Sequence, residues 1–299
     1  MILDRKPEYI GKDVLVNWLL PPSTRCCSSP ALAKGRIMKK LYIIKVGTTF
    51  CAIAKHFGDF DKWTTAALGV VDVETCILNV EHGAALPKAG ECAGVVITGS
   101  HAMVTDNLPW SVKLEKWIPS LLEACIPLFG ICYGHQLLAQ AAGGQVGFHP
   151  RGKELGTVLV HLLSDCTNDA LFRSLPQSFV VHAGHSQSVL RLPPGATRLA
   201  ANAYEPNHAF RLGDCAWGVQ FHPEYNADIM RSYINEQAEE LKSAGLDSSE
   251  LFRAVSETPV AAETLRNFAR IVEGRLADKE DAGDVLKAMR INLGKASNR

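Results

Sequence analysis

Apolar residues in the first half of this chain fall into short runs separated by helix-forming segments. Four runs are typical of buried strands, at 41–46, 76–80, 93–98 and 126–131. The segments between and after them predict helices in part of 50–69, at 110–124 and at 136–142. Strands joined by helical crossovers form parallel sheets. We therefore predict an α/β fold with a mostly parallel central sheet flanked by helices.

The second half of the chain has a different pattern. Short β-rich segments separated by turn residues predict strands at 157–163, 178–182, 198–201, 208–212 and 217–221. Beyond Pro223, apolar residues at helical spacing predict helices at 226–244, 248–256 and 260–273. The charged segment 276–299 shows no clear periodicity.

The amino-terminal segment lacks any clean hydrophobic period. Residues 1–37 contain Pro21-Pro22 and a Ser/Pro-rich stretch around Cys26-Cys27, whereas a strand-like run begins shortly after Met38. We therefore expect three parts: a disordered extension at 1–37, a folded domain at 38–240 and a helical extension at 241–299. Apolar runs are shorter than the roughly 20 residues that cross a bilayer. We expect a cytoplasmic protein.

Composition narrows the possible partners. In the 299 residues, 31 basic side chains balance 31 acidic ones, so charge favours neither nucleic acid nor an anionic membrane as partner. The nine cysteines are scattered without a Cys-x-x-Cys pair, which indicates reduced thiols and no zinc site. We expect no metal and no cofactor.

One cysteine occupies a position suited to nucleophilic chemistry. Cys132 lies between a predicted strand and a predicted helix, in the sequence Gly130-Ile-Cys132-Tyr-Gly134. Flanking glycines allow a cramped turn that exposes a side chain at its tip, and a helix N-terminus favours a thiolate. By itself the pattern also fits a small buried cysteine in a glycine-rich turn.

A second stretch could supply the other groups that a thiol nucleophile needs. The predicted strand at 217–221 is followed by His222-Pro223-Glu224, which places a carboxylate two residues after an imidazole. A nucleophile requires a base, and the base requires an orienting acceptor. Taken alone, His222 could equally cap a strand, but the two stretches together favour a Cys-His-Glu site.

These two motifs, Gly-Ile-Cys-Tyr-Gly-His-Gln and Gly-Val-Gln-Phe-His-Pro-Glu, resemble the signatures of class I glutamine amidotransferase domains, especially the glutaminase domain of GMP synthase. The resemblance covers about residues 40–230. It implies hydrolysis of the glutamine side-chain amide through a γ-glutamyl thioester. It also implies that Cys132 is the nucleophile, His222 the base and acid, and Glu224 the residue that orients His222.

The resemblance also indicates an oxyanion hole. Residues 95–100 correspond to a family strand that ends in a Gly-Gly loop, although Ser100 replaces the second glycine here. Backbone N–H groups must point at the developing oxyanion. Gly99, Ser100 and Tyr133 are therefore the candidates, and a simple turn without a donor role is the alternative.

Substrate contacts are expected from two further places. Gln136 lies one helical turn after Cys132, so its amide can face the same pocket, and the family uses this glutamine to hold substrate. The stretch 182–187 resembles the Ser-His-Gly-Asp loop that grips the amino-acid end of glutamine. It contributes His185, Ser186 and Gln187, with Ser186 and Gln187 in place of Gly and Asp, and His185 is better explained as a loop organiser than as a second base.

Three functions remain open at this point. The chain could be an amidotransferase that hydrolyses glutamine for a separate synthase partner, because no ATP-pyrophosphatase loop follows Glu224. It could be a stand-alone hydrolase of γ-glutamyl peptides or amides with the same three catalytic residues. It could also be a catalytically retired interaction protein, although retired relatives commonly lose the cysteine or the histidine.

Overall fold

The computed structural model describes residues 38–296, so the predicted extension at 1–37 lies outside the described residues. A nine-stranded sheet forms the centre of the fold, in the order β2-β1-β3-β4-β11-β10-β9-β6-β7. The first five strands in this order are mutually parallel, and the remaining four continue the sheet in antiparallel fashion. The strands are β1 (Lys40–Lys45), β2 (Thr75–Asn79), β3 (Cys92–Ile97), β4 (Leu128–Ile131), β6 (Glu154–Leu162), β7 (Ser178–His185), β9 (Ala196–Ala201), β10 (Ala209–Leu212) and β11 (Ala216–Val219).

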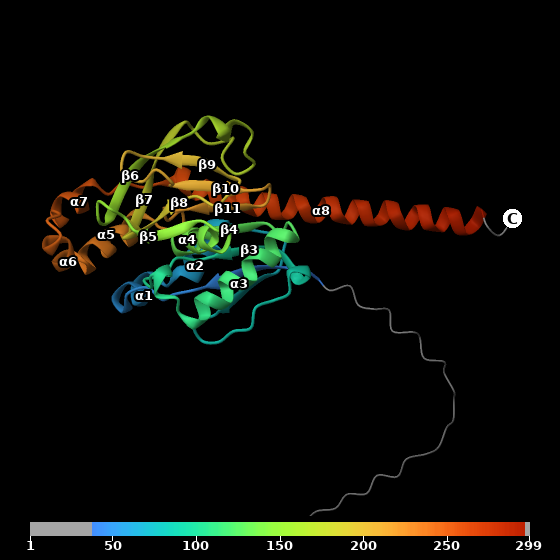
Figure 1. Cartoon of the computed structure of the whole chain (residues 1–299), viewed down its shortest axis with the longest axis horizontal. Coiled ribbons are helices and arrows are strands. Elements are labelled where there is room, and N and C mark those ends of the chain that lie inside the picture. Colours follow the sequence, from blue (N-terminus) through green and yellow to red (C-terminus); the bar gives the residue numbers. More distant parts are fainter. Residues whose placement is uncertain (1–37, 297–299) are drawn as a thin grey trace, which may run out of the picture. The chain divides into compact units, whose positions relative to one another are not determined.

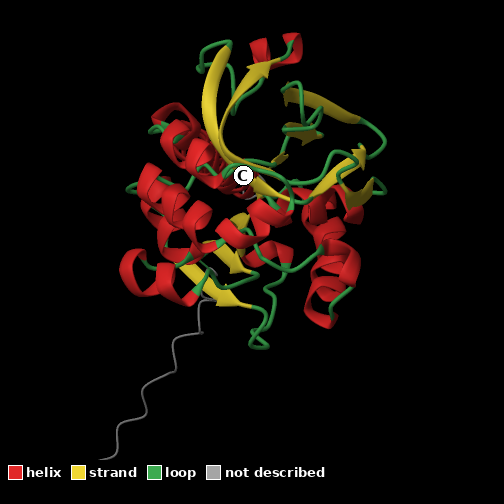
Figure 2. Ribbon diagram, turned by 90° about the vertical axis from the view of Figure 1, so that its left-hand side faces the viewer, coloured by secondary structure: helices red, strands yellow, loops and turns green. Residues whose placement is uncertain are grey.

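Helices cover both faces of this sheet, as the α/β prediction requires (Figure 1). Helices α3 (Pro109–Glu123) and α4 (Tyr133–Ala141) pack against one face, and their core includes Leu114 and Leu137. Helices α2 (Phe60–Leu68) and α8 (Pro259–Ala296) pack against the other face, with Phe268 fully buried there. The core of the domain therefore forms two layers, one on each side of the sheet (Figure 2).

A third apolar cluster joins the short helices of the structure. It combines Ile53 of α1 (Cys51–Phe57) with aromatic side chains of α2 and α5 (Ala227–Glu236), including Trp63 and Tyr233. Helices α6 (Ala238–Ser243) and α7 (Ser248–Ala254) complete this region. This cluster forms one wall of the cavity described below, because Tyr225, Met230 and Tyr233 belong to both.

Several element predictions need correction. The segment 226–244 is two helices rather than one, since the chain turns at Gln237 between α5 and α6. The last helix runs from Pro259 to Ala296 and so includes most of the charged segment 276–299, where no helix was predicted. Two strands were missed, β5 (Gln145–Phe148) and β8 (Gln187–Arg191), which pair with each other in a separate small sheet.

The missed strand β8 changes the description of 182–187. This segment is not a loop: β7 continues to His185, and β8 begins at Gln187 after the single residue Ser186. These residues are in strands because β7 pairs with β6 along its whole length and β8 pairs with β5. Local composition could not reveal either partner.

Candidate active site

Cys132 lies at a strained turn between β4 and α4. Its backbone has φ 47° and ψ −94°, in the left-handed half of conformational space that side chains other than glycine rarely adopt. A Cβ atom at Gly130 would lie 2.4 Å from the Gly134 carbonyl oxygen, and one at Gly134 would lie 2.5 Å from that of Ile97. The two glycines therefore allow this tight turn, as the sequence predicted.

Strand pairing brings the distant histidine to the cysteine. Strands β4 and β11 are parallel neighbours, with Ile131 opposite Val219, so the residues that follow both strands emerge at the same sheet edge. The backbone N–H of Cys132 donates to the Val219 carbonyl at 2.8 Å. The N–H of His222 donates to the His182 carbonyl at the same distance, which fixes the turn after β11.

His222 and Glu224 form a buried pair. Nδ1 of His222 and Oε1 of Glu224 lie 2.8 Å apart, and both residues are almost completely buried. The ring of Tyr225 stacks on the ring of His222, with centroids 4.2 Å apart and planes 19° apart. The carboxylate and the stacking ring together fix the orientation of the imidazole, and they leave Nε2 as its free nitrogen.

The electrostatics of this pair favour a protonated imidazole. Burial alone lowers the pKa of His222, but the negative charge of Glu224, the charge of Cys132 and hydrogen bonds to both residues raise it to about 10. A cationic imidazole next to a thiol stabilises the thiolate form, which is the nucleophile.

Gln220 is a contact of the cysteine that the sequence reasoning missed. Its Nε2 donates to Cys132 Sγ at 3.5 Å and its Oε1 accepts from Gln136 Nε2 at 3.0 Å. Gln220 lies inside the second motif, two residues before His222, so its place in that motif could have indicated a role at the site. The two glutamines connect the helix after Cys132 with the turn after β11.

The candidates for an oxyanion hole lie beside these groups. A Cβ at Gly99 would lie 2.9 Å from Cε1 of His222, so glycine is needed here for the ring to fit. Ser100 follows it, and its Oγ accepts from the Ala102 N–H at 3.1 Å. Tyr133 is the first residue of α4, so its N–H has no carbonyl partner within the helix.

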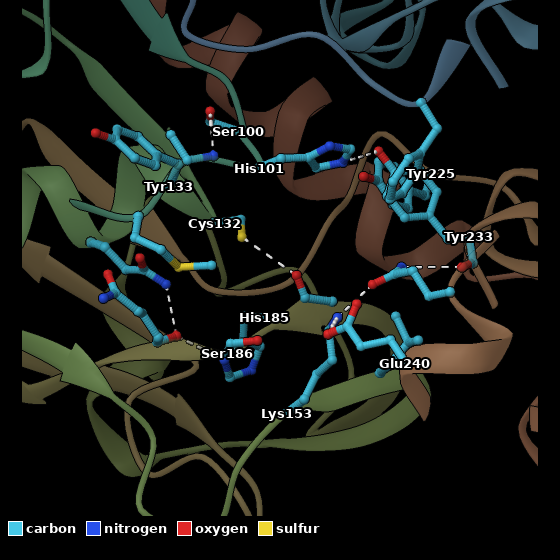
Figure 3. Close-up of a pocket in the computed structure, with 18 of the residues that line it drawn as sticks. Ser100, His101, Cys132, Tyr133, Lys153, His185, Ser186, Tyr225, Tyr233 and Glu240 are labelled. Carbon is cyan, nitrogen blue, oxygen red and sulfur yellow. Dashed lines mark hydrogen bonds and ion pairs between the residues drawn. The ribbon is translucent and has the colours of Figure 1, made fainter. Parts of the chain in front are cut away.

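A cavity of about 240 Å³ opens onto the cysteine (Figure 3). Cys132, Ser100, Tyr133, Gln136 and the 184–187 segment are among the residues that line it. The lining also includes aromatic and aliphatic side chains, namely Phe50, Met103, Leu155, Tyr225, Met230 and Tyr233. All four of the predicted substrate contacts, Gln136, His185, Ser186 and Gln187, are among the lining residues.

Two of these four residues already donate hydrogen bonds to other groups of the protein. Gln136 Nε2 donates to the Gln187 carbonyl at 2.8 Å, and Gln187 Nε2 donates to Thr105 Oγ1 at 2.6 Å. Gln187 is 1% exposed, and its Oε1 is buried without a hydrogen-bond partner among the described residues. This amide oxygen can therefore still accept a hydrogen bond.

His185 has both ring nitrogens engaged. Nδ1 lies 3.0 Å from the Gln187 carbonyl and Nε2 lies 2.9 Å from Glu154 Oε2. Glu154 also lies 3.2 Å from His208 Nε2. Burial alone would raise the pKa of Glu154, but its interactions with His185 and His208 hold it below its usual range. This arrangement organises the strand ends, and His208 is a member that sequence spacing did not indicate.

The cavity also contains an ion pair that the sequence reasoning did not find. Lys153 Nζ lies 2.7 Å from Glu240 Oε1 and donates to Gln237 Oε1 at 2.5 Å. Lys153 immediately precedes β6, whereas Glu240 belongs to α6, which is 87 positions further along the chain. Figure 3 shows the two residues beside each other at the cavity, on a side different from Ser100 and Tyr133.

Two general features of the described part bear on function. Among residues 38–278, no group of three or more His, Cys, Asp or Glu side chains is arranged to hold a metal ion. None of the helices searched in that part of the chain combines the length and the apolar character needed to cross a bilayer.

Comparison with known proteins identifies the class. The model of the family "Glutamine amidotransferase class-I" matches residues 55–239, which is more than half of the chain. The chain therefore belongs to the class I glutamine amidotransferases, as the two motifs indicated.

Individual relatives match only about half of this chain. The chain is 35% identical over 158 residues to the GMP synthase [glutamine-hydrolyzing] of Aeropyrum pernix, a match covering 51% of this chain and 28% of that protein. It is 32% identical over 144 residues to gamma-glutamyl peptidase 5 of Arabidopsis thaliana, covering 48% of this chain and 57% of the relative. The chain thus spans from about a quarter to rather more than half of the length of these relatives.

Solved structures share the fold. A glutamine amido transferase from Methylobacillus flagellatus superposes with a TM-score of 0.62 at 25% identity, over 81% of this chain and 95% of that one. A glutamine amidotransferase from Thermotoga maritima superposes with a TM-score of 0.61 at 24% identity, over 78% and 98%. These matches agree with the α/β architecture described above.

Proposed function

We propose that this chain hydrolyses the side-chain amide of glutamine, or a γ-glutamyl amide, through a thioester on Cys132. The observation that carries the proposal is the convergence of Cys132, which lines the cavity from its strained turn, with the buried His222–Glu224 pair. A thiol, a base and an orienting carboxylate in this order are the parts that nucleophilic amide hydrolysis requires.

The reaction follows from these parts. Sγ of Cys132 attacks the amide carbon, and the N–H groups of Ser100 and Tyr133 stabilise the oxyanion of the tetrahedral intermediate. His222 carries the proton from the thiol and gives it to the leaving nitrogen, so that the C–N bond breaks and ammonia or an amine departs. A water molecule, deprotonated by His222, then attacks the thioester, and glutamate and the free thiol are released.

The remaining predicted residues have supporting roles in this proposal. Glu224 holds His222 with Nε2 free and stabilises the imidazolium. Gln136, Ser186 and Gln187 line the cavity where the γ-glutamyl group binds, and Gln187 Oε1 can accept a hydrogen bond from it. His185 acts as a positioning residue through its bonds to Glu154 and the Gln187 carbonyl.

Two versions of the function differ in the nitrogen leaving group. In the first, ammonia from glutamine passes to a separate synthase partner, as the similarity to GMP synthases suggests. In the second, the chain alone hydrolyses γ-glutamyl peptides or amides. The cavity supports the second version, because its apolar wall of Phe50, Tyr225, Met230 and Tyr233 offers more contact than an ammonia leaving group could use.

The test is release of glutamate and ammonia from L-glutamine, compared with release of glutamate from a panel of γ-glutamyl peptides. Cys132→Ser is the inactive blank, and Cys76→Ser, a cysteine on the edge strand β2, is the matched control. Turnover by the wild type and by Cys76→Ser, but not by Cys132→Ser, supports the proposal. Peptide turnover without glutamine turnover selects the hydrolase. No turnover of any substrate would instead support a retired scaffold.

A further inference from the structure

The cavity that opens onto Cys132 contains a pair of opposite charges. Among the described lining residues, Lys153 and Glu240 are the only lysine, arginine, aspartate or glutamate side chains. They have opposite signs and touch each other, with Nζ and Oε1 2.7 Å apart. The rest of the lining is apolar or neutral and polar, apart from two histidines: His185, which is paired with Glu154, and His101, whose pKa burial lowers. The cavity therefore presents one positive and one negative group side by side.

A ligand matches this pair when it carries one anion and one cation on neighbouring atoms. The α-carbon of glutamine, or of any γ-glutamyl compound, carries a carboxylate and an ammonium in that relation. The leaving part of a γ-glutamyl peptide does not, since its nitrogen is an uncharged amide. A ligand with a single charge would leave one member of the pair without a partner.

A ligand can separate Lys153 from Glu240 at a low cost in free energy. The Lys153 side chain is 16% exposed and is also held by Gln237, whereas the Glu240 side chain is 63% exposed. An ion pair with one member exposed to water contributes little to stability. Separating the two groups to admit a zwitterion therefore costs little, and each group gains a new charged partner.

The ends of β7 and β8, which line the same cavity beside Lys153, carry no competing charge. Ser186 and Gln187 are neutral, and Gln187 Nε2 is already bound to Thr105. An ammonium group in this cavity thus finds a carboxylate only on α6. We propose that Glu240 binds the α-ammonium and Lys153 the α-carboxylate of the γ-glutamyl group, an inference that rests on the proposed function for the reaction at Cys132.

This assignment sets the substrate class. The substrate must have a free α-ammonium and a free α-carboxylate, as glutamine and amino-terminal γ-glutamyl compounds have. Glutamine within a polypeptide is excluded, because both of its α-groups are uncharged amides. N-acylated γ-glutamyl compounds are excluded because they lack the cation.

Three anilides that differ only in the α-groups test the assignment. The γ-glutamyl p-nitroanilide carries both charges, the glutaryl p-nitroanilide lacks the ammonium, and the 4-aminobutyryl p-nitroanilide lacks the carboxylate. For the wild type we expect KM to rise about tenfold or more for each truncated substrate, since a charge-assisted contact of this kind is worth about one power of ten.

The variants then assign each charge to its residue. Glu240→Gln should raise KM for the γ-glutamyl substrate about tenfold and leave KM for the glutaryl substrate unchanged. Lys153→Met, which keeps the apolar stem, should raise KM for the γ-glutamyl substrate about tenfold and leave KM for the 4-aminobutyryl substrate unchanged. Glu239→Gln and Lys242→Met remove the same charges from exposed positions of α6 and serve as controls. Equal responses of all three substrates to a variant would overturn the assignment.

Binding without turnover separates this inference from the proposed function. In the Cys132→Ser background, calorimetry should show that glutamate binds more tightly than glutarate, and that Glu240→Gln removes this difference. If no anilide is hydrolysed but the binding pattern holds, the inference stands while the hydrolytic function fails. If glutamate and glutarate bind equally in the background that retains Lys153 and Glu240, the inference fails.

Discussion

Nδ1 of His222 lies 2.8 Å from Oε1 of Glu224, inside a site where both residues are more than 90% buried. The carboxylate is followed in the chain by Tyr225, whose ring stacks on the imidazole. Two residues of the same turn, Glu224 and Tyr225, therefore fix the position of the imidazole that carries the proton.

Removing the charge of Glu224 should affect catalysis more than binding. We expect Glu224→Gln to lower kcat by about 10²- to 10⁴-fold with a small change in KM, because the imidazolium loses its counter-charge and its orientation. The pKa of His222 should also fall, since Glu224 is the largest of the influences that raise it. Steady-state kinetics over a range of pH measures both effects. Glu236→Gln, an exposed change on α5, is the control, and an unchanged kcat in Glu224→Gln would contradict the proposed role.

Acid should destabilise the fold through two buried histidines. Burial lowers the pKa of His135 to about 3 and that of His182 to about 4, below the value of about 6.5 for an unfolded chain. Their contribution to stability is complete above pH 6.5. This contribution is lost as the pH falls from 6.5 towards 4, because the unfolded state binds protons that the folded state does not bind.

Urea unfolding at several pH values measures this loss. We expect each histidine to cost on the order of 1–2 kcal/mol of unfolding free energy between pH 7.5 and pH 5. His135→Leu should flatten the dependence, whereas the exposed His56→Gln should leave it as in the wild type. An unaltered slope in His135→Leu would show that His135 does not titrate in this way.

The turn at Cys132 should not tolerate a side chain at Gly130. In Gly130→Ala the new Cβ would lie 2.4 Å from the Gly134 carbonyl, and the backbone of α4 would have to move. We expect a loss of more than about 3 kcal/mol of unfolding free energy, or no folded protein. Gly274→Ala is the matched control. Nothing lies within 4 Å of its Cβ position on helix α8, so it should stabilise by about 0.5–1 kcal/mol. Equal effects of the two changes in chemical unfolding would refute the steric explanation.

Helix α8 should be needed for the stability of the domain. Phe268 is fully buried against the sheet, with its ring centroid 5.4 Å from that of Phe129. Phe268→Ala should cost about 3–5 kcal/mol of unfolding free energy because it leaves a cavity between helix and sheet. Phe148→Ala, at a position that is 64% exposed, should cost much less. A similar small cost for both would mean that α8 is an appendage, as the expected helical extension at 241–299 implied.

The elements that depend on local pattern could be predicted from the sequence. The four parallel strands before Cys132 follow from short apolar runs, and the turn at Cys132 follows from the flanking Gly130 and Gly134, since a Cβ at Gly130 would collide with the backbone of the same turn. The motifs themselves indicated Cys132, His222 and Glu224, because the chemistry of a thiol nucleophile requires those side-chain types.

Only the tertiary structure decided which distant residues meet. The pairing of β5 with β8 is held by partners more than 35 positions apart, so local composition could not indicate it. The ion pair of Lys153 and Glu240 joins residues 87 positions apart, one before a strand and one on a helix, neither in a motif. Sequence pattern records which face of an element is apolar, whereas the approach of two elements depends on how all of them pack. The sequence alone therefore determined the reactive groups, and the packed fold decided the shape and charge of the cavity around them.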